Sequence, residues 1–402
     1  MFVLDRFISR FVIKRDTSMF LKDIEDNKEI LSSKIKGKTV LVIGGAGSIG
    51  SSFIKALLPF EPSELVVVDI NENALAELTR DLRSTKQLKV PEGYITYPMD
   101  YASPVFEKMF RAKRGFDIVA NFSAHKHVRS EKDIYSIEAL LQNNVLHVKL
   151  LLDLLSEFPP EEYFCVSTDK AANPVNIMGA SKRIMEDVIF SYSDRFPVKT
   201  ARFANVAFSN GSLPAGFLVR IQKLQPLSAP SDVQRYFVSP EESGQICLLS
   251  CMLGENRAIF FPKLSEAQMM TFDAIATELL KEYGYEIYEC ASDEEAIEKA
   301  EELREGSNFY PVHYSKSDTS GEKAFEEFVT DTESADYDRF FSLGVITDKP
   351  IPDKSKVESL VEQLNTKFDK DNNTKEEIVA ILKDYLPYFE HIETGKSLDS
   401  KM

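Results

Sequence analysis

The sequence predicts an α/β fold in which a doubly wound parallel sheet is followed by a smaller C-terminal lobe. Strand-like and helix-like segments alternate from about residue 39 to residue 206, and the strand-like runs are continuously apolar. Such runs suit strands that are covered on both faces by helices, which is the arrangement that alternation produces. After about residue 210 the alternation fades and prolines become frequent. Strands are expected at TVLVI, ELVVVDI, YITYPMD, FDIVANFSA, EYFCVST and VKTARFANV.

Four segments follow from this pattern. Residues 1–36 place apolar and charged positions at helical spacing and are expected to form a helical extension. Residues 37–212 hold the alternating strands and helices, residues 213–346 form the smaller lobe, and residues 347–402 form a helical tail. The last helix of that tail is expected at EEIVAILKDYL.

Composition excludes several classes of protein. A net charge of −16 without a strongly basic stretch argues against a nucleic-acid-binding protein. No uncharged apolar window approaches 18 residues, so we expect no membrane span, and charged residues interrupt the first apolar positions where a secretory signal would lie. The four cysteines show no paired spacing, and Cys247 and Cys251 suit core packing better than a metal site. A cytoplasmic protein without a bound metal is expected.

The run GGAGSIG directly follows the strand VLVI and opens a helix. Small residues let a backbone approach a pyrophosphate, and the helix N-terminus supplies unpaired N–H groups and a positive dipole end. This context predicts a Rossmann-type domain that binds a dinucleotide. The expected contacts are Gly44, Gly47, Ser48, Ile49 and Gly50.

Two carboxylates end the next strands. Asp69 follows Gly50 by 19 residues, at the end of ELVVVDI, where a carboxylate can bind the ribose hydroxyls of an adenosine. Because a 2′-phosphate would meet this negative charge, Asp69 favours NAD over NADP. Asp100, at the end of YITYPMD, is a candidate for the adenine edge or for the cap of a turn.

The run STDKAANPVNIMGASKR follows the strand EYFCV, so its first residues should emerge at the carboxyl edge of the sheet, where ligands bind in open α/β folds. Met178 and Lys182 lie one helical turn apart, which lets Lys182 reach a cofactor ribose beside position 178. Taken alone, Asp169 and Lys170 could equally form a capped turn with a surface ion pair.

Several stretches together carry a resemblance. GGAGSIG, NFSAHKHVRSEKD, STDKAANPVNIMGASKR, RFANV and SGEKAFEEF, in this order, resemble the extended short-chain dehydrogenase/reductases. Within that superfamily they are most similar to the polysaccharide-biosynthesis group of UDP-N-acetylglucosamine 4,6-dehydratases, over about residues 36–328. The resemblance implies a bound NAD(P) and a nucleotide-sugar substrate. Its carbon 4 is oxidised, water is eliminated across carbons 5 and 6, and the hydride returns to carbon 6.

The resemblance also implies roles for the catalytic run. Thr168 would bind the sugar near its 4-hydroxyl, Asp169 would protonate the departing 6-hydroxyl, and Lys170 would remove the carbon-5 proton. Lys182 would hold the cofactor ribose. Met178 occupies the position of the superfamily's usual tyrosine, as it does in one branch of these dehydratases. The base for the 4-hydroxyl is then unassigned, and we suggest Asp169 acting through Thr168 or a water.

Further residues take their expected roles from the same resemblance. Ala124 would lie beside the nicotinamide, and Asn144 would order the active-site lysine and a water. The departure SDTSGEKAFEEF places Thr319 and Ser320 where the family commonly has Arg-Pro, which leaves the identity of the nucleotide open. His125 and His127 lack an acidic or cysteine partner that would make them a metal pair. The expected substrate contacts are His125, Lys126, Asn144, Arg202, Asn205 and Arg235.

Other functions stay open at this point. An epimerase, or a dehydratase that also inverts carbon 5, would share the oxidised intermediate. A catalytically silent dinucleotide-binding scaffold is an alternative of another class, although the joint presence of Thr168, Asp169, Lys170 and Lys182 argues against it. The resemblance further implies a homo-oligomer.

Overall fold

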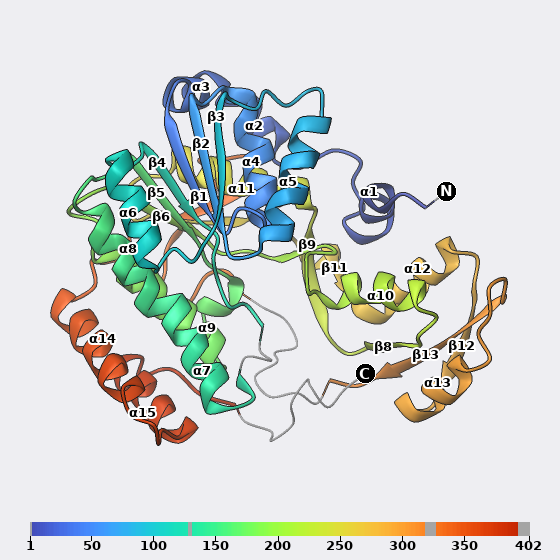
Figure 1. Ribbon diagram of the computed structural model, residues 1–402. Helices are drawn as coiled ribbons and strands as arrows, with labels where there is room; N and C mark the ends of the chain where they lie inside the picture. The colour runs from blue at the N-terminus through green and yellow to red at the C-terminus, as the bar shows by residue number, and fades with distance from the viewer. Residues whose placement is uncertain (1, 128–130, 318–326, 393–402) are drawn as a thin grey trace.

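The computed structural model describes residues 2–127, 131–317 and 327–392. Its centre is a nine-stranded sheet with the order β14-β15-β10-β6-β5-β4-β1-β2-β3 (Figure 1). The strands from β3 to β10 are parallel, and at one edge β15 runs antiparallel to β10 and β14 runs antiparallel to β15. The prediction of an α/β fold with a doubly wound sheet is therefore confirmed. The bounds are β1 Thr39–Ile43, β2 Glu64–Asp69, β3 Gly93–Pro98, β4 Ile118–Asn121, β5 Glu162–Val166, β6 Val198–Ala201, β10 Ile259–Pro262, β14 Ala335–Asp336 and β15 Leu343–Ile346.

Helices cover both faces of this sheet, as continuously buried strands require. Two apolar cores result, one on each face. The first lies under α4 (Ser48–Leu57), α5 (Glu72–Ser84) and α11 (Pro240–Leu253), and the second lies under α6 (Pro104–Lys113), α7 (Ile134–Leu141), α8 (His147–Leu155) and α9 (Ile177–Phe190). Gly244 lets α11 lie directly against α4, because a Cβ there would meet the backbone of Ser52.

The smaller lobe holds two three-stranded sheets beside the carboxyl edge of the large sheet (Figure 1). Its apolar core includes residues of the helices α10 and α12. The elements are β7 Asn205–Val206, β8 Leu227–Pro230, β9 Gln234–Val238, β11 Met269–Thr271, β12 Glu286–Cys290 and β13 Phe309–Ser315, with α10 Leu213–Gln222, α12 Phe272–Glu282 and α13 Asp293–Ala300.

Two boundaries expected from the sequence differ from the structure. The run VKTARFANV is not one strand, because it leaves the large sheet after Ala201 and continues as β7, which pairs with β9. Residues 213–346 are not one continuous lobe either, since α11, β10, β14 and β15 return to the large sheet. The returning segments are apolar, and they extend and cover the core that the first six strands leave exposed.

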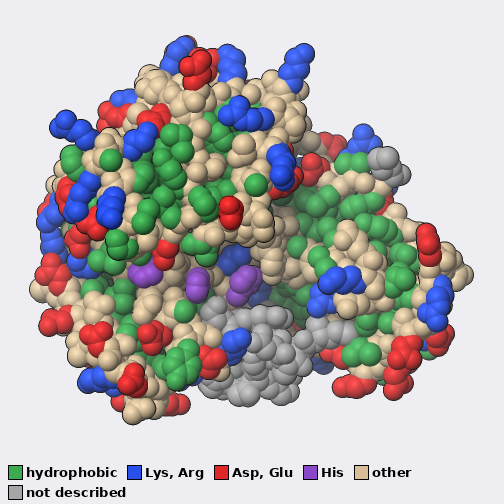
Figure 2. Space-filling model, in the orientation of Figure 1, with side chains coloured by type: hydrophobic (Ala, Val, Ile, Leu, Met, Phe, Trp, Pro, Cys, Tyr) green, Lys and Arg blue, Asp and Glu red, His purple; other side chains and the backbone are tan. Residues whose placement is uncertain are grey.

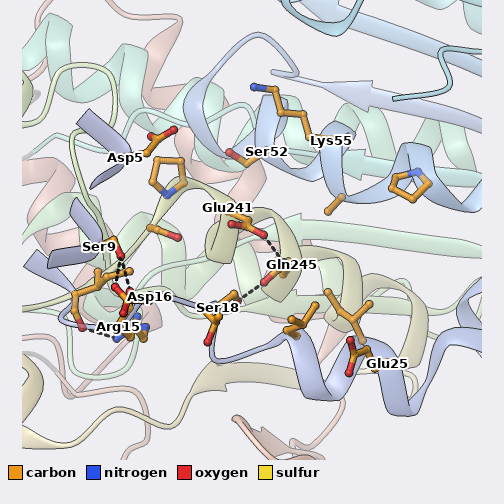
Figure 3. A pocket seen from close by; sticks show the side chains of 18 of the residues that line it. Asp5, Ser9, Arg15, Asp16, Ser18, Glu25, Ser52, Lys55, Glu241 and Gln245 are labelled. Carbon is orange, nitrogen blue, oxygen red and sulfur yellow. Dashed lines mark hydrogen bonds between the residues drawn. The ribbon is translucent and has the colours of Figure 1, made fainter. Parts of the chain in front are cut away.

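The N-terminal extension contacts both parts of the molecule. Its helix α1 (Leu4–Phe7) and π-helical turn η1 (Ile8–Val12) pack into the core of the smaller lobe, whereas α2 (Leu21–Asp26) and α3 (Lys28–Ile35) lie against the large sheet domain. Between them, Arg15 forms an ion pair with Glu242 of α11 at 2.6 Å. A pocket of about 820 Å³ lies here, and Figure 3 shows Arg15, Ser18 and Gln245 along it. The extension thereby joins the two lobes.

The C-terminal tail packs on the opposite face, beside α7 and α9 (Figure 1). It consists of α14 (Lys354–Phe368) and α15 (Lys375–Tyr385), whose apolar sides include Leu360, Leu364 and Leu382. Within the described part of the chain, no helix combines the length and the apolar composition needed to span a bilayer.

Candidate active site

The candidate site lies at the carboxyl ends of β1, β4 and β5. Strand β1 pairs with β2 on one side and β4 on the other, so the strand order reverses between β1 and β4. Ligands of open α/β sheets bind in the crevice at such a reversal. Figure 2 shows histidine side chains near the centre of this view, beside the hollow between the two lobes.

The glycine turn after β1 has a shape that only small residues allow. Gly44 has a φ of +70°, and a Cβ at this position would lie 2.7 Å from the backbone nitrogen of Ser123. Helix α4 then begins at Ser48 with Gly47 as its N-cap, and no side chain caps its first turn. The first-turn N–H groups and the positive end of the helix dipole are therefore available to an anion such as a pyrophosphate.

Asp69 lies next to this turn. Its Oδ2 accepts a hydrogen bond from the backbone N–H of Ala46 at 3.1 Å, and its Oδ1 accepts one from Asn71 at 3.0 Å. The carboxylate is thus fixed at the end of β2, beside the pyrophosphate turn, where an adenosine ribose would lie. The residues present fit a dinucleotide on three counts: the sterically required glycine, the uncapped helix N-terminus and this carboxylate.

Asp100 has a simpler environment. It is exposed, and its Oδ1 accepts a hydrogen bond from the N–H of Ala102 at 2.9 Å. Of the two roles expected for this residue, the structure contains the turn cap. A contact with the adenine edge stays a prediction.

The catalytic run folds into a compact cluster after β5, where η5 (Asp169–Ala171) forms a single 3-10 turn. Three donors meet at Oδ1 of Asp169. They are the hydroxyl of Thr168 at 2.7 Å, the backbone N–H of Lys170 at 2.9 Å and the Lys170 ammonium at 3.2 Å. The Asp169 side chain is 4% exposed and that of Lys170 is 18% exposed. The acid, the base and the hydroxyl predicted from the sequence therefore lie within hydrogen-bond reach of one another.

Helix α9 carries the other two residues of the run. Its N-cap is Asn176, whose side chain accepts a hydrogen bond from Gly179 N at 2.7 Å. Met178 and Lys182 are both buried, and Lys182 Nζ lies 3.0 Å from the sulfur of Met185. Burial lowers the pKa of Lys182, although Glu186 and Cys165 act in the opposite direction. The contact of Lys182 with a cofactor ribose stays a prediction.

Asn144 holds the segment that follows β4. It lies in a π-helical turn, η4 (Gln142–Leu146), a helix form that often occurs at functional sites. Its Nδ2 donates to the carbonyl of His125 and its Oδ1 accepts from the N–H of His125, both at 2.9 Å. Its Nδ2 also reaches Ser181 of α9 at 3.0 Å. Asn144 therefore positions the backbone beside the site and is 1% exposed itself.

Two other predicted contacts line the same segment. The side chains of His125 and Lys126 are exposed, and Ala124 before them is half-buried. Desolvation lowers the pKa of both His125 and Lys126, and the charge of His147 lowers that of His125 further. A contact of His125 and Lys126 with a sugar nucleotide stays a prediction.

Arg202 requires a correction. The sequence predicted a contact with the diphosphate, but Arg202 is fully buried and its guanidinium binds two carboxylates. Nε and Nη2 donate to Glu186 at 3.0 and 2.8 Å, and Nη1 and Nη2 donate to Glu333 at 2.7 and 2.9 Å. Burial raises the pKa of each carboxyl, but Arg202 and Lys349 outweigh it and keep both pKa values below their usual range. In this arrangement Arg202 is structural.

The remaining predicted contacts are less defined. Asn205 lies half-buried on β7, and Arg235 is buried on β9 with its Nη1 donating to the carbonyl of Gln234 at 2.8 Å. Their roles stay predictions. Thr319 and Ser320 lie outside the described residues. Among residues 2–127, 131–317 and 327–392, no three histidine, cysteine or acidic side chains are grouped so as to hold a metal.

One residue at the site was not predicted. Glu131 is buried, and its Oε1 accepts a hydrogen bond from the backbone N–H of Met178 at 2.9 Å. The two residues are 47 positions apart, and a glutamate in the charged stretch RSEKD looks like an ordinary surface residue. Only the fold brings it to the start of α9.

Comparison with known proteins identifies the family. A family model described as polysaccharide biosynthesis protein matches residues 40–342. The chain belongs to this family. The chain is also an extended short-chain dehydrogenase/reductase, as the sequence motifs predicted. Some of its curated relatives are named as nucleotide-sugar dehydratases and epimerases.

Three similar proteins show the extent of the likeness. An uncharacterized membrane protein of Methanocaldococcus jannaschii is 31% identical over 304 residues, which cover 70% of this chain and 88% of that protein. A UDP-N-acetylglucosamine 4,6-dehydratase (inverting) of Campylobacter jejuni is 24% identical over 326 residues, or 78% of this chain and 89% of that enzyme. Among solved structures, Pen from Bacillus thuringiensis superposes with a TM-score of 0.63 at 19% identity, covering 88% of this chain and 98% of its own.

The chain spans only about half, or less, of the length of two other curated relatives. It spans 51% of EpsC of Bacillus subtilis and 40% of CapD of Staphylococcus aureus, two proteins named for polysaccharide biosynthesis. The likeness to the solved structure shows the fold alone.

Proposed function

We propose that this chain is a nucleotide-sugar 4,6-dehydratase, a hydro-lyase that converts UDP-N-acetylglucosamine to a 4-keto-6-deoxy sugar for the synthesis of a surface polysaccharide or glycan. The observation that carries the proposal is the Thr168–Asp169–Lys170 cluster at the carboxyl end of β5. An epimerase needs one oxidation and one return of hydride, whereas elimination of water needs an additional acid and base. Asp169 and Lys170 supply such a pair.

Thr168 and Asp169 account for the first proton. The Thr168 hydroxyl is 2.7 Å from Asp169 Oδ1, so the 4-hydroxyl of a sugar beside Thr168 can pass its proton to Asp169 through that hydroxyl. The glycine turn after β1 and Asp69 would hold a nicotinamide dinucleotide, which would supply the hydride transfer that oxidises carbon 4 and later reduces carbon 6. This assignment uses Asp169 where the superfamily's usual tyrosine is replaced by Met178.

Lys170 and Asp169 then divide the elimination. The neutral amine of Lys170 takes the carbon-5 proton, which the neighbouring 4-keto group makes acidic, and Asp169 gives its proton to the 6-hydroxyl, which leaves as water. The products are an ammonium on Lys170 and a carboxylate on Asp169. These are the two charges of the ion pair at 3.2 Å, so mutual attraction favours the state that elimination produces. Return of the Lys170 proton to carbon 5 closes the cycle.

We also propose NAD as the cofactor, since the carboxylate of Asp69 would repel the 2′-phosphate of NADP. A homo-oligomer and a cytoplasmic location complete the proposal. Release of the bound dinucleotide by denaturation, followed by mass spectrometry, tests the first point; finding only NADP would contradict it.

The reaction is tested by incubating the protein with UDP-N-acetylglucosamine in deuterated water and following the sugar by NMR. We expect loss of the 6-hydroxyl and a deuteron at carbon 5, and the configuration at that carbon distinguishes inversion from retention. Inversion at carbon 4 with the 6-hydroxyl intact would instead indicate an epimerase. Failure of every nucleotide sugar tried to give a 4-keto-6-deoxy product would refute the proposal, and a dinucleotide-loaded but inert protein would indicate a scaffold.

A further inference from the structure

The C-terminal tail reaches the helix that carries Met178 and Lys182. After α15 the chain continues to Ile392, whose N–H donates to the carbonyl of Val175 at 3.0 Å, just before α9 begins. Next to it, His391 Nε2 lies 3.5 Å from Glu131 Oε2. The side chains of His391 and Glu131 are 9% and 7% exposed. The segment of His391 and Ile392 is therefore packed against Glu131 and the start of α9, although it lies more than 200 residues after them in the sequence.

Glu131 connects this tail to the start of α9. Its second oxygen, Oε1, accepts the N–H of Met178, which is one of the first-turn N–H groups that a helix cannot satisfy itself. The ammonium of Lys375 at the start of α15 reaches the backbone carbonyl of Glu131 at 3.3 Å. The tail thus contacts Glu131 from two sides, with a hydrogen bond from Lys375 and a 3.5 Å approach of His391 that forms no hydrogen bond, while Glu131 accepts the N–H of Met178 on α9.

The neighbouring cap shows that a structural bond alone does not require a buried carboxylate. Asn176 satisfies the next N–H of the same turn, that of Gly179, with an uncharged amide at 2.7 Å. Glu131 belongs to the segment after β4 and bonds the start of α9, which follows β5, whereas the bond between Gly179 and Asn176 lies within α9 and its cap. The bond from Met178 to Glu131 thus links the segment after β4 to the start of α9.

We propose that Glu131 is a positioning residue for the dehydration site and that the C-terminal tail, through Lys375 and His391, holds it in place. This inference rests on the proposed function. Glu131 touches no reacting atom. It sets where α9 begins, and so where Met178 and Lys182 stand relative to Lys170.

Steady-state kinetics with UDP-N-acetylglucosamine test the proposal on the full chain. We expect Glu131→Ala to lower kcat at least tenfold with KM changed less than twofold. The variant should still bind its substrate, but Met178 and Lys182 should be displaced relative to Lys170. Glu131→Gln keeps an oxygen for the N–H of Met178, so it should recover kcat to within about threefold of wild type. Tyr385→Phe is the matched control: it removes a tail contact with Asp187, farther along α9, and should leave kcat unchanged.

A double-mutant cycle tests the part played by the tail. His391→Leu should lower kcat three- to tenfold, and the double variant Glu131→Ala/His391→Leu should lose no more than Glu131→Ala alone, because both changes act through one contact. Additive losses, an unchanged kcat in Glu131→Ala, or a loss equal to that of Tyr385→Phe would overturn the proposal.

Hydrogen–deuterium exchange separates this proposal from the proposed function. In the wild-type chain the peptide that contains Met178 should exchange slowly, and Glu131→Ala and His391→Leu should each speed its exchange at least tenfold, whereas Glu131→Gln and Tyr385→Phe should not. This readout does not depend on the reaction. If no sugar nucleotide is dehydrated but the exchange pattern holds, the function is wrong and the positioning contact is right; unchanged exchange would refute the contact itself.

Discussion

Two clusters of acidic and basic side chains lie at the ends of the adjacent strands β5 and β6, and they differ in how deeply the cation is buried. After β6, the Arg202 guanidinium is fully buried and each of its two carboxylate partners, Glu186 and Glu333, makes at least two bonds to it. After β5, the donors around Asp169 all meet at Oδ1, and Lys170 keeps 18% of its side chain exposed. The first is a saturated cluster, in which every carboxylate oxygen of Glu186 and Glu333 accepts a bond from Arg202, and the second is an open cluster, because Lys170 is partly exposed.

The difference indicates which cluster can exchange protons. Protonating Glu186 or Glu333 would leave the charge of Arg202 buried with one partner fewer, and such an imbalance is expensive in a low-dielectric interior. Between Asp169 and Lys170 the transfer of one proton neutralises both members, and Lys170 is partly exposed. Residue type alone does not reveal this difference, because both clusters combine carboxylates with a cation. The burial of the cation reveals it.

The largest effect is expected when the open cluster loses its acid. Asp169→Asn keeps the shape of the side chain but cannot carry a proton between the two hydroxyls, so turnover of the nucleotide sugar should fall by about 10²–10⁴-fold, the usual contribution of a general acid. The NMR assay measures it. Asp353→Asn is the matched control, since Asp353 is an exposed residue that caps α14 in the C-terminal tail, and it should retain full activity. Full turnover in Asp169→Asn would remove Asp169 from the mechanism.

The saturated cluster should respond in stability. Arg202→Met leaves Glu186 and Glu333 buried without their common partner and should reduce the free energy of unfolding by about 3–5 kcal/mol, as the loss of one member of a buried ion pair does. Urea unfolding measures the change. If Arg202 instead bound the substrate diphosphate, the variant would unfold at the wild-type urea concentration and lose affinity for the nucleotide sugar.

The same comparison explains which parts of the structure could be predicted from the sequence. The strand, glycine turn and helix around Gly44 follow one another directly in the sequence, and the bonds that join Thr168, Asp169 and Lys170 link adjacent residues, so both could be predicted from local sequence. Arg202 was misassigned because Glu333 lies 131 residues away.

The lobe boundaries were misplaced for a related reason. The pattern after residue 210 shows that regular alternation stops, but it does not show that an apolar helix such as α11 returns to cover the first core. That return depends on the area that the earlier strands leave exposed. It is a property of the assembled sheet.

A smaller effect is expected at the cofactor half of the site. Asp69→Ala removes the carboxylate beside the glycine turn, and the affinity for NAD should fall about tenfold, in line with one lost hydrogen bond to a charged group. Affinity for NADP should rise relative to that for NAD because the negative charge is gone. Calorimetric titration of the dinucleotide-free protein with each cofactor gives both values. An unchanged ratio would mean that Asp69 only stabilises the turn through Ala46 and Asn71.

The smallest effect concerns the residue that joins the two clusters. The hydroxyl of Ser167 donates to Glu186 at 2.8 Å, and Ser167 directly precedes Thr168. Ser167→Ala removes one bond from a carboxylate that Arg202 already holds, so the free energy of unfolding should fall by only about 1 kcal/mol. If the clusters are independent, turnover changes less than twofold and the stability loss adds to that of Asp169→Asn. A tenfold loss of turnover would show instead that the saturated network holds Thr168 in place, and the division between a structural and a chemical cluster would then fail at Ser167.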